Sequence, residues 1–340
     1  MSSPAVSVLL PCYNGGAALD RSLQSISQQT FENFELIAVD DGSTDESPAV
    51  LARWSEADPR LTVIRQDHRG IVAALQAGLE ACSAPLVARM DHDDYAHPER
   101  LALQKEFLEA NPDIAVAGCL VRGAPEGAVQ EGLQIYLAWQ NSLVAEADIR
   151  REIFIESPFV HPSVMFRSDA VRAAGGYQEH GWPEDYDLWL RLYLQGAGFG
   201  KVPQVLFDWY ERPGRLTRAD SRYSLENFLR AKACYLARGP LAGREEVFIW
   251  GAGMTGRRLT KQLERQDAPL KAFIDVDPAK IGKTRRGLPV LAPAELPELW
   301  TQASQPVLLA AVRARRARPL IRRHIAELGL EEGQDWWFAA

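Results

Sequence analysis

Three carboxylates lie within four residues of one another in this 340-residue sequence, at Asp91, Asp93 and Asp94, with His92 between the first two. Carboxylates this close repel one another unless a cation neutralises them. Their hard oxygen atoms suit Mg²⁺ or Mn²⁺, which bind a few protein carboxylates together with substrate phosphates. A solvated acidic loop is the alternative. We favour a metal site because the cluster directly follows an apolar run, residues 86–90, that is typical of a buried strand.

A second pair of acids, Asp40 and Asp41, ends another apolar run at residues 34–39. An Asp at the end of a strand can accept a hydrogen bond from a nucleotide base or a ribose hydroxyl. The same segment also fits a turn in which Ser43 or Thr44 caps the following helix. The two interpretations are compatible, because Asp41 can bind a ligand while Ser43 caps.

Glu184 and Asp185 form a third acidic group, just before a helix expected at residues 187–195. A carboxylate at this place can act as the general base that accepts the proton of an incoming hydroxyl. Acidic residues are also common in the first turn of helices, where the helix dipole stabilises them. From these residues alone, the structural explanation is the stronger of the two.

The elements that must position these groups alternate between strands and helices. Apolar runs predict strands at residues 6–10, 34–39, 61–64 and 86–90, and helical spacing predicts helices at residues 19–29, 45–54 and 71–82. This alternation indicates βαβ units and a mainly parallel sheet. Ligands bind beyond the carboxyl ends of such strands, where residues 11–14, 40–41 and 91–94 converge.

The length of the chain favours two domains. We expect a first α/β domain at residues 1–222 and a helical linker and hinge at residues 223–243. A small Rossmann-like α/β domain is expected at residues 244–340, with strands at residues 247–250, 270–275 and 306–312.

A glycine-rich turn opens the second domain. Gly251, Gly253 and Gly256 follow a strand and begin a helix, which is the context of a dinucleotide-binding turn. Asp275 ends the next strand, close to the position of a ribose-binding acid. NAD(P) is therefore a conceivable ligand, but no set of dehydrogenase residues accompanies the turn. We favour a structural or nucleotide-sensing role.

A strongly basic helix is expected at residues 314–328. The alternatives are a solvated face and a surface for an anionic acceptor, a lipid headgroup or a partner. Its arginines and the one just before it are Arg313, Arg315, Arg316, Arg318, Arg322 and Arg323.

The composition limits partners and compartment. A formal net charge of −7 argues against non-specific binding to nucleic acid. Four widely spaced cysteines indicate neither a zinc site nor a disulfide framework. No run approaches the roughly 20 apolar residues that span a bilayer, and the start lacks the pattern of a signal peptide. We expect a cytoplasmic protein, with peripheral contact at the inner face of the membrane as a further option.

Taken in order, these segments resemble glycosyltransferase family 2. The resemblance rests on residues 6–14, on residues 28–45, on Asp91-His92-Asp93 as an Asp-x-Asp motif and on Glu184-Asp185 as a Glu-Asp motif, and it covers roughly residues 5–210. It implies a GT-A fold, a nucleoside-diphosphate sugar donor such as a UDP-sugar, a divalent metal (Mn²⁺ or Mg²⁺) and inversion at the anomeric carbon.

The resemblance also implies roles for individual residues. Asp185, next to Glu184, would deprotonate the hydroxyl of a glycan or glycolipid acceptor. The metal ligands would be Asp91, Asp93 and Asp94. The nucleotide sugar would contact Pro11, Tyr13, Asp40, Asp41, Arg69, Asp91, His92 and Asp93.

The chain also departs from the family pattern. Many members carry Arg-Asn in the helix after the third strand, where this chain has Leu75-Gln76. The Gln-x-x-Arg-Trp motif of processive synthases is missing. We therefore expect a non-processive enzyme of cell-surface polysaccharide, lipopolysaccharide or glycoconjugate synthesis. His161 fits either the acceptor site or a structural role.

Two other functions remain as alternatives. A nucleotide- or dinucleotide-sensing protein with an inactive transferase domain would use the turn at residues 251–256. A nucleotidyltransferase acting on sugar phosphates would need a glycine-rich triphosphate loop after the first strand, and the sequence has none there.

Overall fold

The computed structural model describes residues 3–125, 127, 129–212 and 220–340. The chain folds into two compact units. Unit 1 comprises residues 1–150, 157–180 and 184–219, and unit 2 comprises residues 151–156, 181–183 and 220–340. Residues 213–219, near the end of the first expected domain (residues 1–222), lie outside the described residues, and residues 220–222 belong to unit 2.

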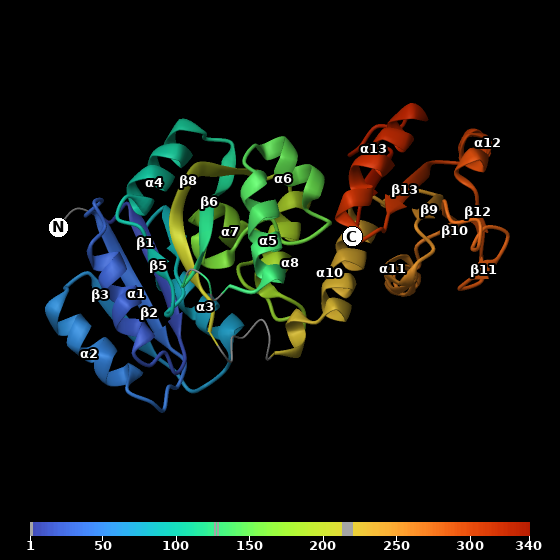
Figure 1. Cartoon of the computed structure of the whole chain (residues 1–340). Helices are drawn as coiled ribbons and strands as arrows, with labels where there is room; N and C mark the ends of the chain where they lie inside the picture. Colours follow the sequence, from blue (N-terminus) through green and yellow to red (C-terminus); the bar gives the residue numbers. More distant parts are fainter. Residues whose placement is uncertain (1–2, 126, 128, 213–219) are drawn as a thin grey trace. The chain divides into compact units, whose positions relative to one another are not determined.

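Unit 1 is built on a mixed sheet of eight strands in the order β3-β2-β1-β4-β7-β6-β8-β5 (Figure 1). Its first four strands in this order are all parallel, as the sequence predicts. β7 then runs antiparallel to both of its neighbours. The strands are β1 (Val6–Cys12), β2 (Phe34–Asp40), β3 (Leu61–Arg65), β4 (Leu86–Arg89), β5 (Tyr95–Ala96), β6 (Ile114–Ala124), β7 (Met165–Arg167) and β8 (Gly198–Tyr210).

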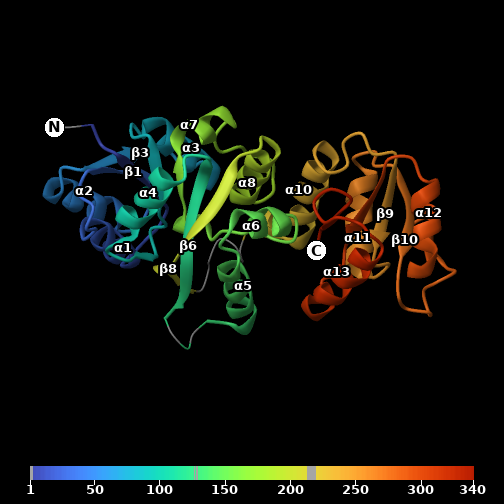
Figure 2. The ribbon, with the colours of Figure 1, turned by 90° about the horizontal axis from the view of Figure 1, so that it is seen from above.

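Helices cover both faces of this sheet (Figure 2). Side chains alternate between the faces along a strand, and both faces of β1 are apolar. Val8 and Leu10 belong to the core shared with α1, α2 and α4. Leu9 faces α3, where a Cβ on Gly78 would overlap it. The helices are α1 (Ala18–Ser27), α2 (Ser47–Ala57), α3 (Ile71–Ala81), α4 (Arg100–Ala110), α5 (Glu131–Ser142), α6 (Glu146–Glu152), α7 (Ser168–Ala173) and α8 (Glu184–Leu194).

Unit 2 has its own sheet, in the order β11-β12-β10-β9-β13-β14. β9 pairs in parallel with β10 on one side and with β13 on the other, which is a Rossmann-like arrangement. The helix α10, which the sequence places in a linker, packs on α11 within this unit. The elements are α10 (Leu225–Arg238), β9 (Glu246–Trp250), α11 (Met254–Glu264), β10 (Leu270–Ile274), β11 (Thr284–Arg285), β12 (Leu288–Leu291), α12 (Leu296–Gln302), β13 (Pro306–Ala310), α13 (Arg318–Glu327) and β14 (Trp336–Phe338).

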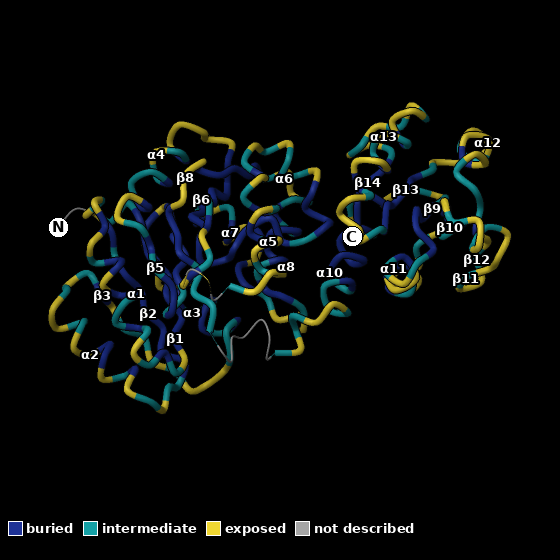
Figure 3. The backbone as a smooth tube through the Cα atoms, in the orientation of Figure 1, coloured by how far each residue is buried: buried dark blue, intermediate teal, exposed yellow. Residues whose placement is uncertain are grey.

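Burial follows this layered plan in each unit. The central strands are buried, whereas the outer faces of the helices are exposed (Figure 3). No helix in the described part of the chain is both long and apolar enough to cross a membrane.

Candidate active site

The predicted site residues of unit 1 follow three neighbouring strands. β1 lies between β2 and β4 and is parallel to both, so the carboxyl ends of the three strands share one edge of the sheet. Cys12 pairs with Asp40 in register, and Pro11 is buried in β1 just before it. The loops after these strands therefore meet at this edge, as expected for a ligand crevice.

The loops after β1 and β2 are tied together by hydrogen bonds. The backbone N–H of Asn14 donates to Ser43 Oγ at 2.9 Å, and Thr44 N–H donates to Asn14 Oδ1 at 2.9 Å. Asp40 Oδ1 accepts from Ser43 N–H at 3.0 Å, so the Asp40 carboxylate shapes the turn. Ser43 and Thr44 do not cap α2, which begins at Ser47 without a side-chain cap. The predicted cap is wrong because Ser43 is used by the neighbouring loop.

Asp41 organises the loop after β3. Its Oδ1 accepts from Gln66 Nε2 at 2.6 Å and from Arg69 N–H at 2.9 Å, and its Oδ2 accepts from Gly70 N–H at 2.8 Å. His68 Nδ1 lies 2.9 Å from the same Oδ2. The carboxylate is 2% exposed and already accepts several hydrogen bonds. A nucleotide base that contacts Asp41 would have to share or replace one of these hydrogen bonds.

An aromatic pair borders the same loops. The ring of Tyr13 stacks on His68 with centroids 3.9 Å apart and an interplanar angle of 20°. Tyr13 is 41% exposed, so the pair offers a flat surface beside Asp41. The Arg69 side chain is exposed next to it and makes no hydrogen bond or ion pair within the described ranges. Such a surface suits a planar base.

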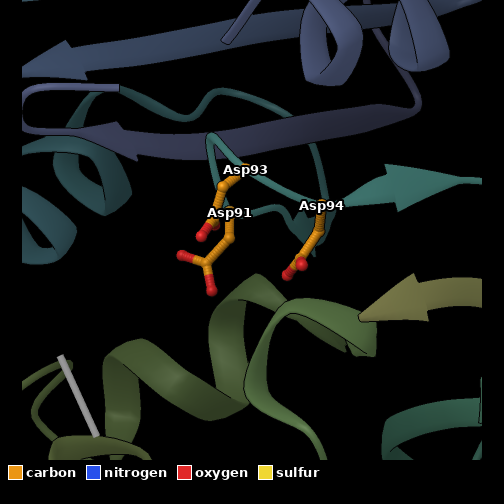
Figure 4. A group of neighbouring side chains, drawn as sticks. All are labelled: Asp91, Asp93 and Asp94. Atoms are coloured by element: carbon orange, nitrogen blue, oxygen red, sulfur yellow. The ribbon is translucent and has the colours of Figure 1, made fainter. Parts of the chain in front are cut away.

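The three acids after β4 come together as predicted. Each of Asp91, Asp93 and Asp94 offers one carboxylate oxygen, and these atoms all lie within 4.8 Å of one another. Figure 4 shows the three side chains extending to the same side of the segment between β4 and β5. Asp94 is fully buried, and its Oδ1 accepts from Tyr210 N–H at 2.8 Å. Three hard oxygen donors at this spacing fit Mg²⁺ or Mn²⁺.

Three arginines surround these acids, and two of them come from distant parts of the chain. Arg89 pairs with Asp91, and Arg212 Nε lies 2.5 Å from Asp93 Oδ2. Arg212 Nη2 also lies 2.9 Å from His92 Nε2. Arg21 donates to the Asp93 carbonyl oxygen at 2.6 Å. These cations offset the repulsion within the cluster, and the cluster with its arginines can receive a diphosphate and its metal together.

The start of α8 carries the predicted catalytic pair. Glu184 is buried, with Oε1 3.8 Å from His161 Nδ1. Asp185 is half-buried, and its Oδ1 accepts from Tyr186 N–H at 2.7 Å. Burial opposes the charge on Arg89, but Asp91 and, to a smaller extent, Glu184 raise its pKa above the ordinary value. Arg89 therefore links the acid cluster electrostatically to the first turn of α8.

His161 is buried among other side chains, which favours the structural role over a place in the acceptor site. It is 8% exposed, and its Nε2 lies 2.9 Å from the Tyr177 hydroxyl. Its ring packs edge-on against Trp189, with centroids 5.9 Å apart. Burial, aided by the nearby Arg89 charge, holds the pKa of His161 well below its ordinary value. The imidazole is therefore neutral at neutral pH and supports the wall behind Glu184.

Several residues of this site escape the sequence patterns. His68 and Arg212 are not part of any sequence motif, and Arg21 lies on a helix that the sequence predicts only as amphipathic. Arg89 did leave a signal, because a charged residue interrupts the apolar run at residues 86–90. A buried charge of this kind requires a partner, and the nearest acid along the chain is Asp91.

The glycine turn of unit 2 adopts the predicted strand–turn–helix form between β9 and α11. Asp275 follows β10, but its carboxylate is turned inward. Its Oδ2 accepts from Ala252 N–H at 2.8 Å, its Oδ1 accepts from Asp277 N–H at 2.9 Å, and Lys280 Nζ lies 3.2 Å away. Asp275 thus holds the turn in place.

Comparison with known proteins identifies the family. Residues 7–174 match the family described as Glycosyl transferase family 2. The amylovoran biosynthesis glycosyltransferase AmsE of Erwinia amylovora is 36% identical over 203 residues, which are 59% of this chain and 74% of that protein. A UDP-Gal:alpha-D-GlcNAc-diphosphoundecaprenol beta-1,3-galactosyltransferase of Escherichia coli is 30% identical over 209 residues, 61% of this chain and 74% of that protein. The chain belongs to glycosyltransferase family 2.

Solved structures agree on the fold. The S. aureus TarS fragment 1–349 in complex with UDP-GlcNAc superposes with a TM-score of 0.58 at 19% identity, covering 76% of this chain and 72% of that one. The mannosyltransferase PcManGT from Pyrobaculum calidifontis, in complex with GDP-Man and Mn²⁺, gives 0.52 at 20% identity, covering 70% and 64%. The predicted GT-A fold is thereby confirmed. The family membership shown by the sequence relatives makes the protein a glycosyltransferase.

Proposed function

We propose that this glycosyltransferase moves one sugar from a nucleoside-diphosphate donor to an acceptor hydroxyl, with inversion at the anomeric carbon and with a divalent metal. The observation that carries the proposal is the trio Asp91, Asp93 and Asp94, with ligand oxygens within 4.8 Å of one another at the end of β4. The loops after β1, β2 and β3 meet at the same edge, where a nucleotide would lie.

The donor would lie along this edge from base to diphosphate. The Tyr13–His68 pair would support the base, with Pro11 beneath it and Asp40 and Asp41 shaping the loops around it. A UDP-sugar is the simplest donor. The TarS complex with UDP-GlcNAc and the Escherichia coli relative named for UDP-Gal support this choice.

Asp91, Asp93 and Asp94 would hold the metal, Mn²⁺ or Mg²⁺. When bound, such an ion supplies a Lewis acid that neutralises charge on the departing diphosphate. Arg212, which pairs with Asp93, would also pair with phosphate oxygens through charge-assisted hydrogen bonds, whereas Arg69 would contact the donor beside the Tyr13–His68 pair. The PcManGT complex with Mn²⁺ supports the choice of metal.

Asp185 would act as the base, with Glu184 holding its helix turn against His161. The Asp185 carboxylate takes the proton of the acceptor hydroxyl, and the acceptor oxygen forms a bond to the anomeric carbon. The bond from that carbon to the diphosphate oxygen breaks, and the nucleoside diphosphate leaves with the electron pair. A single displacement of this kind needs no protein nucleophile.

The acceptor would be a glycan or a glycolipid in the assembly of a surface polysaccharide. The names of the two relatives, for amylovoran biosynthesis and for a diphosphoundecaprenol-linked acceptor, support this assignment. A lipid-linked acceptor would bring the protein to the inner face of the membrane.

The test is metal-dependent transfer with a panel of nucleotide sugars and lipid-diphosphate sugars, followed by nucleoside diphosphate release and product mass. We expect release with Mn²⁺ or Mg²⁺ and none after chelation. Asp93→Asn should lower the rate by about a hundredfold or more, because one metal ligand is lost. Asp113→Asn makes the same charge change at an exposed residue outside the site and should not alter the rate. No transfer with any donor, acceptor and metal would refute the proposal.

A binding protein with an inactive transferase unit is the second candidate. The pairing of Arg89 with Asp91 and of Arg212 with Asp93 favours it, because two of the three acids are already neutralised without an ion. In that case nucleotide sugars would bind equally well with and without chelator, and no product would form.

A further inference from the structure

Unit 2 contains a pocket that the transferase reaction does not use. Its volume is about 440 Å³, within the range of small-molecule sites. It lies where β9, β10 and β13 end, and it is closed by α11 and α13. β9 is the first of these strands, and the chain passes from it to β10 on one side and then to β13 on the other. Such a switch of direction is where parallel α/β sheets open a binding crevice.

Two glycines of the turn are required by close packing, whereas the third is not. Gly251 has φ +109°, and a Cβ there would clash with Val312. A Cβ on Gly256 would clash with the Gly251 carbonyl oxygen. Gly253 is different, since its φ of −73° suits any residue and nothing lies within 4 Å of the place of a Cβ. Its missing side chain leaves open space in the pocket over the first turn of α11.

Two parts of the pocket lining attract anions. Gly253 is the N-cap of α11, which has 11 residues and no side-chain cap, so its first N–H groups point toward that space. Arg313, just after β13, lines the pocket and is exposed. Its guanidinium makes no hydrogen bond or ion pair to any described residue. An exposed arginine and the start of a helix that line one pocket suit a phosphate group.

Exposed apolar side chains form another part of the lining, which also includes Asp277, Lys280 and His324. The three most exposed large apolar side chains of the described residues are Met254 (61%), Val276 (67%) and Leu320 (69%). All three line this pocket, from three different elements. Their exposure costs free energy in water, which a flat apolar group bound between them would recover.

The hydrogen bonds of Asp275 argue against NAD as the ligand. In a dinucleotide site the acid at this position is free to hold a ribose hydroxyl. Here its two oxygens accept from Ala252 and Asp277 and pair with Lys280. The usual binding mode of NAD therefore lacks its ribose anchor, although the phosphate and apolar parts of the pocket remain.

We propose that the pocket between α11 and α13 binds a single nucleoside diphosphate, without metal and independently of the transferase site. The diphosphate lies over Gly253 and pairs with Arg313. The nucleoside lies against Met254, Val276 and Leu320.

The test is calorimetry on the full chain in EDTA with ADP, UDP, NAD and inorganic pyrophosphate, in the Asp93→Asn background, which removes one of the proposed metal ligands of the transferase site. We expect ADP or UDP to bind at roughly millimolar affinity or tighter. Gly253→Asp should weaken this binding by about tenfold or more, because its carboxylate repels the diphosphate. Asp is a favourable N-cap residue, so this variant should fold as well as the parent. Arg313→Gln should weaken binding by about fivefold or more through the lost pairing.

Matched controls make the result specific. Gly132→Asp places the same charge at an open glycine on α5, and Arg316→Gln removes an exposed arginine that does not line the pocket. Both should leave the affinity within about twofold. Any one of three results would overturn the proposal: no nucleotide binding in EDTA, equal binding by Gly253→Asp and its parent, or pyrophosphate binding as tight as that of the nucleotide. A tenfold preference for NAD over ADP and UDP would replace it with a dinucleotide site.

Discussion

Asp185 and Asp169 occupy equivalent places in two helices. Each lies in the first turn, and each accepts a hydrogen bond from the N–H of the following residue at 2.7 Å. If each carboxylate only stabilised the start of its helix, substitution by Asn would have a similar effect at both positions. What separates them is that Asp185 follows Glu184 in the wall of the site, which Arg89 links to the acid cluster.

We therefore expect Asp185→Asn to lower the transfer rate by about a thousandfold or more, because general-base catalysis contributes about a hundredfold to ten-thousandfold. Donor binding, measured by calorimetry with a UDP-sugar and Mn²⁺, should stay within about threefold of the parent. Asp169→Asn should leave both quantities unchanged. Full turnover by Asp185→Asn would remove the base assignment while leaving the metal site untouched.

His161 predicts a dependence of stability on pH. Burial lowers its pKa in the folded chain, whereas the unfolded chain has a histidine pKa of about 6.5. The unfolded state thus binds a proton that the folded state does not, and the free energy of unfolding falls as the pH drops below about 6.5, by up to about 1.4 kcal/mol per pH unit. In His161→Gln, the free energy of unfolding measured with urea should fall less steeply between pH 6.5 and pH 5 than in the parent. His180→Gln, at an exposed position, should keep the parent slope, and identical slopes in both variants would contradict the assignment.

Close packing of one helix on the sheet gives a prediction at the scale of elements. α3 rests on β1 and β2 at Gly78, where a Cβ would overlap Leu9 and Val39. Gly78→Ala should destabilise the protein by about 1–3 kcal/mol through overpacking, despite the better helix propensity of Ala. Gly132, on α5, has open space around it, so Gly132→Ala should be neutral or stabilising by up to about 1 kcal/mol. Thermal unfolding of the two variants checks these expectations. Similar shifts in Tm for both would show that the packing around Gly78 is loose.

The strands and helices with strong periodicity were predictable, and others were not. β1, β2, β3 and β4 appear within a few residues of their predicted bounds. The long strand β8 was not predicted, because Pro203 lies inside it and its pairing with β6 shifts register repeatedly. The basic helix begins at Arg318, not at residue 314, since Arg315–Ala317 form a 3₁₀ turn.

At the scale of the whole molecule, unit 2 combines segments far apart in the chain. Residues 151–156 and 181–183 belong to it together with residues 220–340. Arg322 shows the consequence, because it pairs with Glu332 at 2.9 Å and also with Glu152, 170 residues away in sequence. Glu152 is only 4% exposed, and Arg151 Nε also lies 3.7 Å from its Oε1.

We expect Arg322→Ala to lower the free energy of unfolding by about 1–2 kcal/mol, since the buried Glu152 loses one of its two cationic partners and Glu332 loses its own. Arg323→Ala should cost less than about 0.5 kcal/mol, because its pairing with Glu327 is an exposed i,i+4 contact. Calorimetric unfolding of both variants provides the comparison. Equal effects would mean that Glu152 finds another partner or becomes solvated.

The amino-acid sequence by itself determined the fold class and pointed to the acids of the candidate site. Both depend on local patterns: apolar runs that end in Asp40-Asp41 and in Asp91 to Asp94, and an acidic first turn at Glu184-Asp185. The tertiary structure alone decided what surrounds them. Arg212 reaches Asp93 across 119 residues, His68 stacks on Tyr13, and Asp275 turns inward to hold its own loop. These contacts depend on which strands lie side by side, and no periodicity or spacing along the chain encodes that.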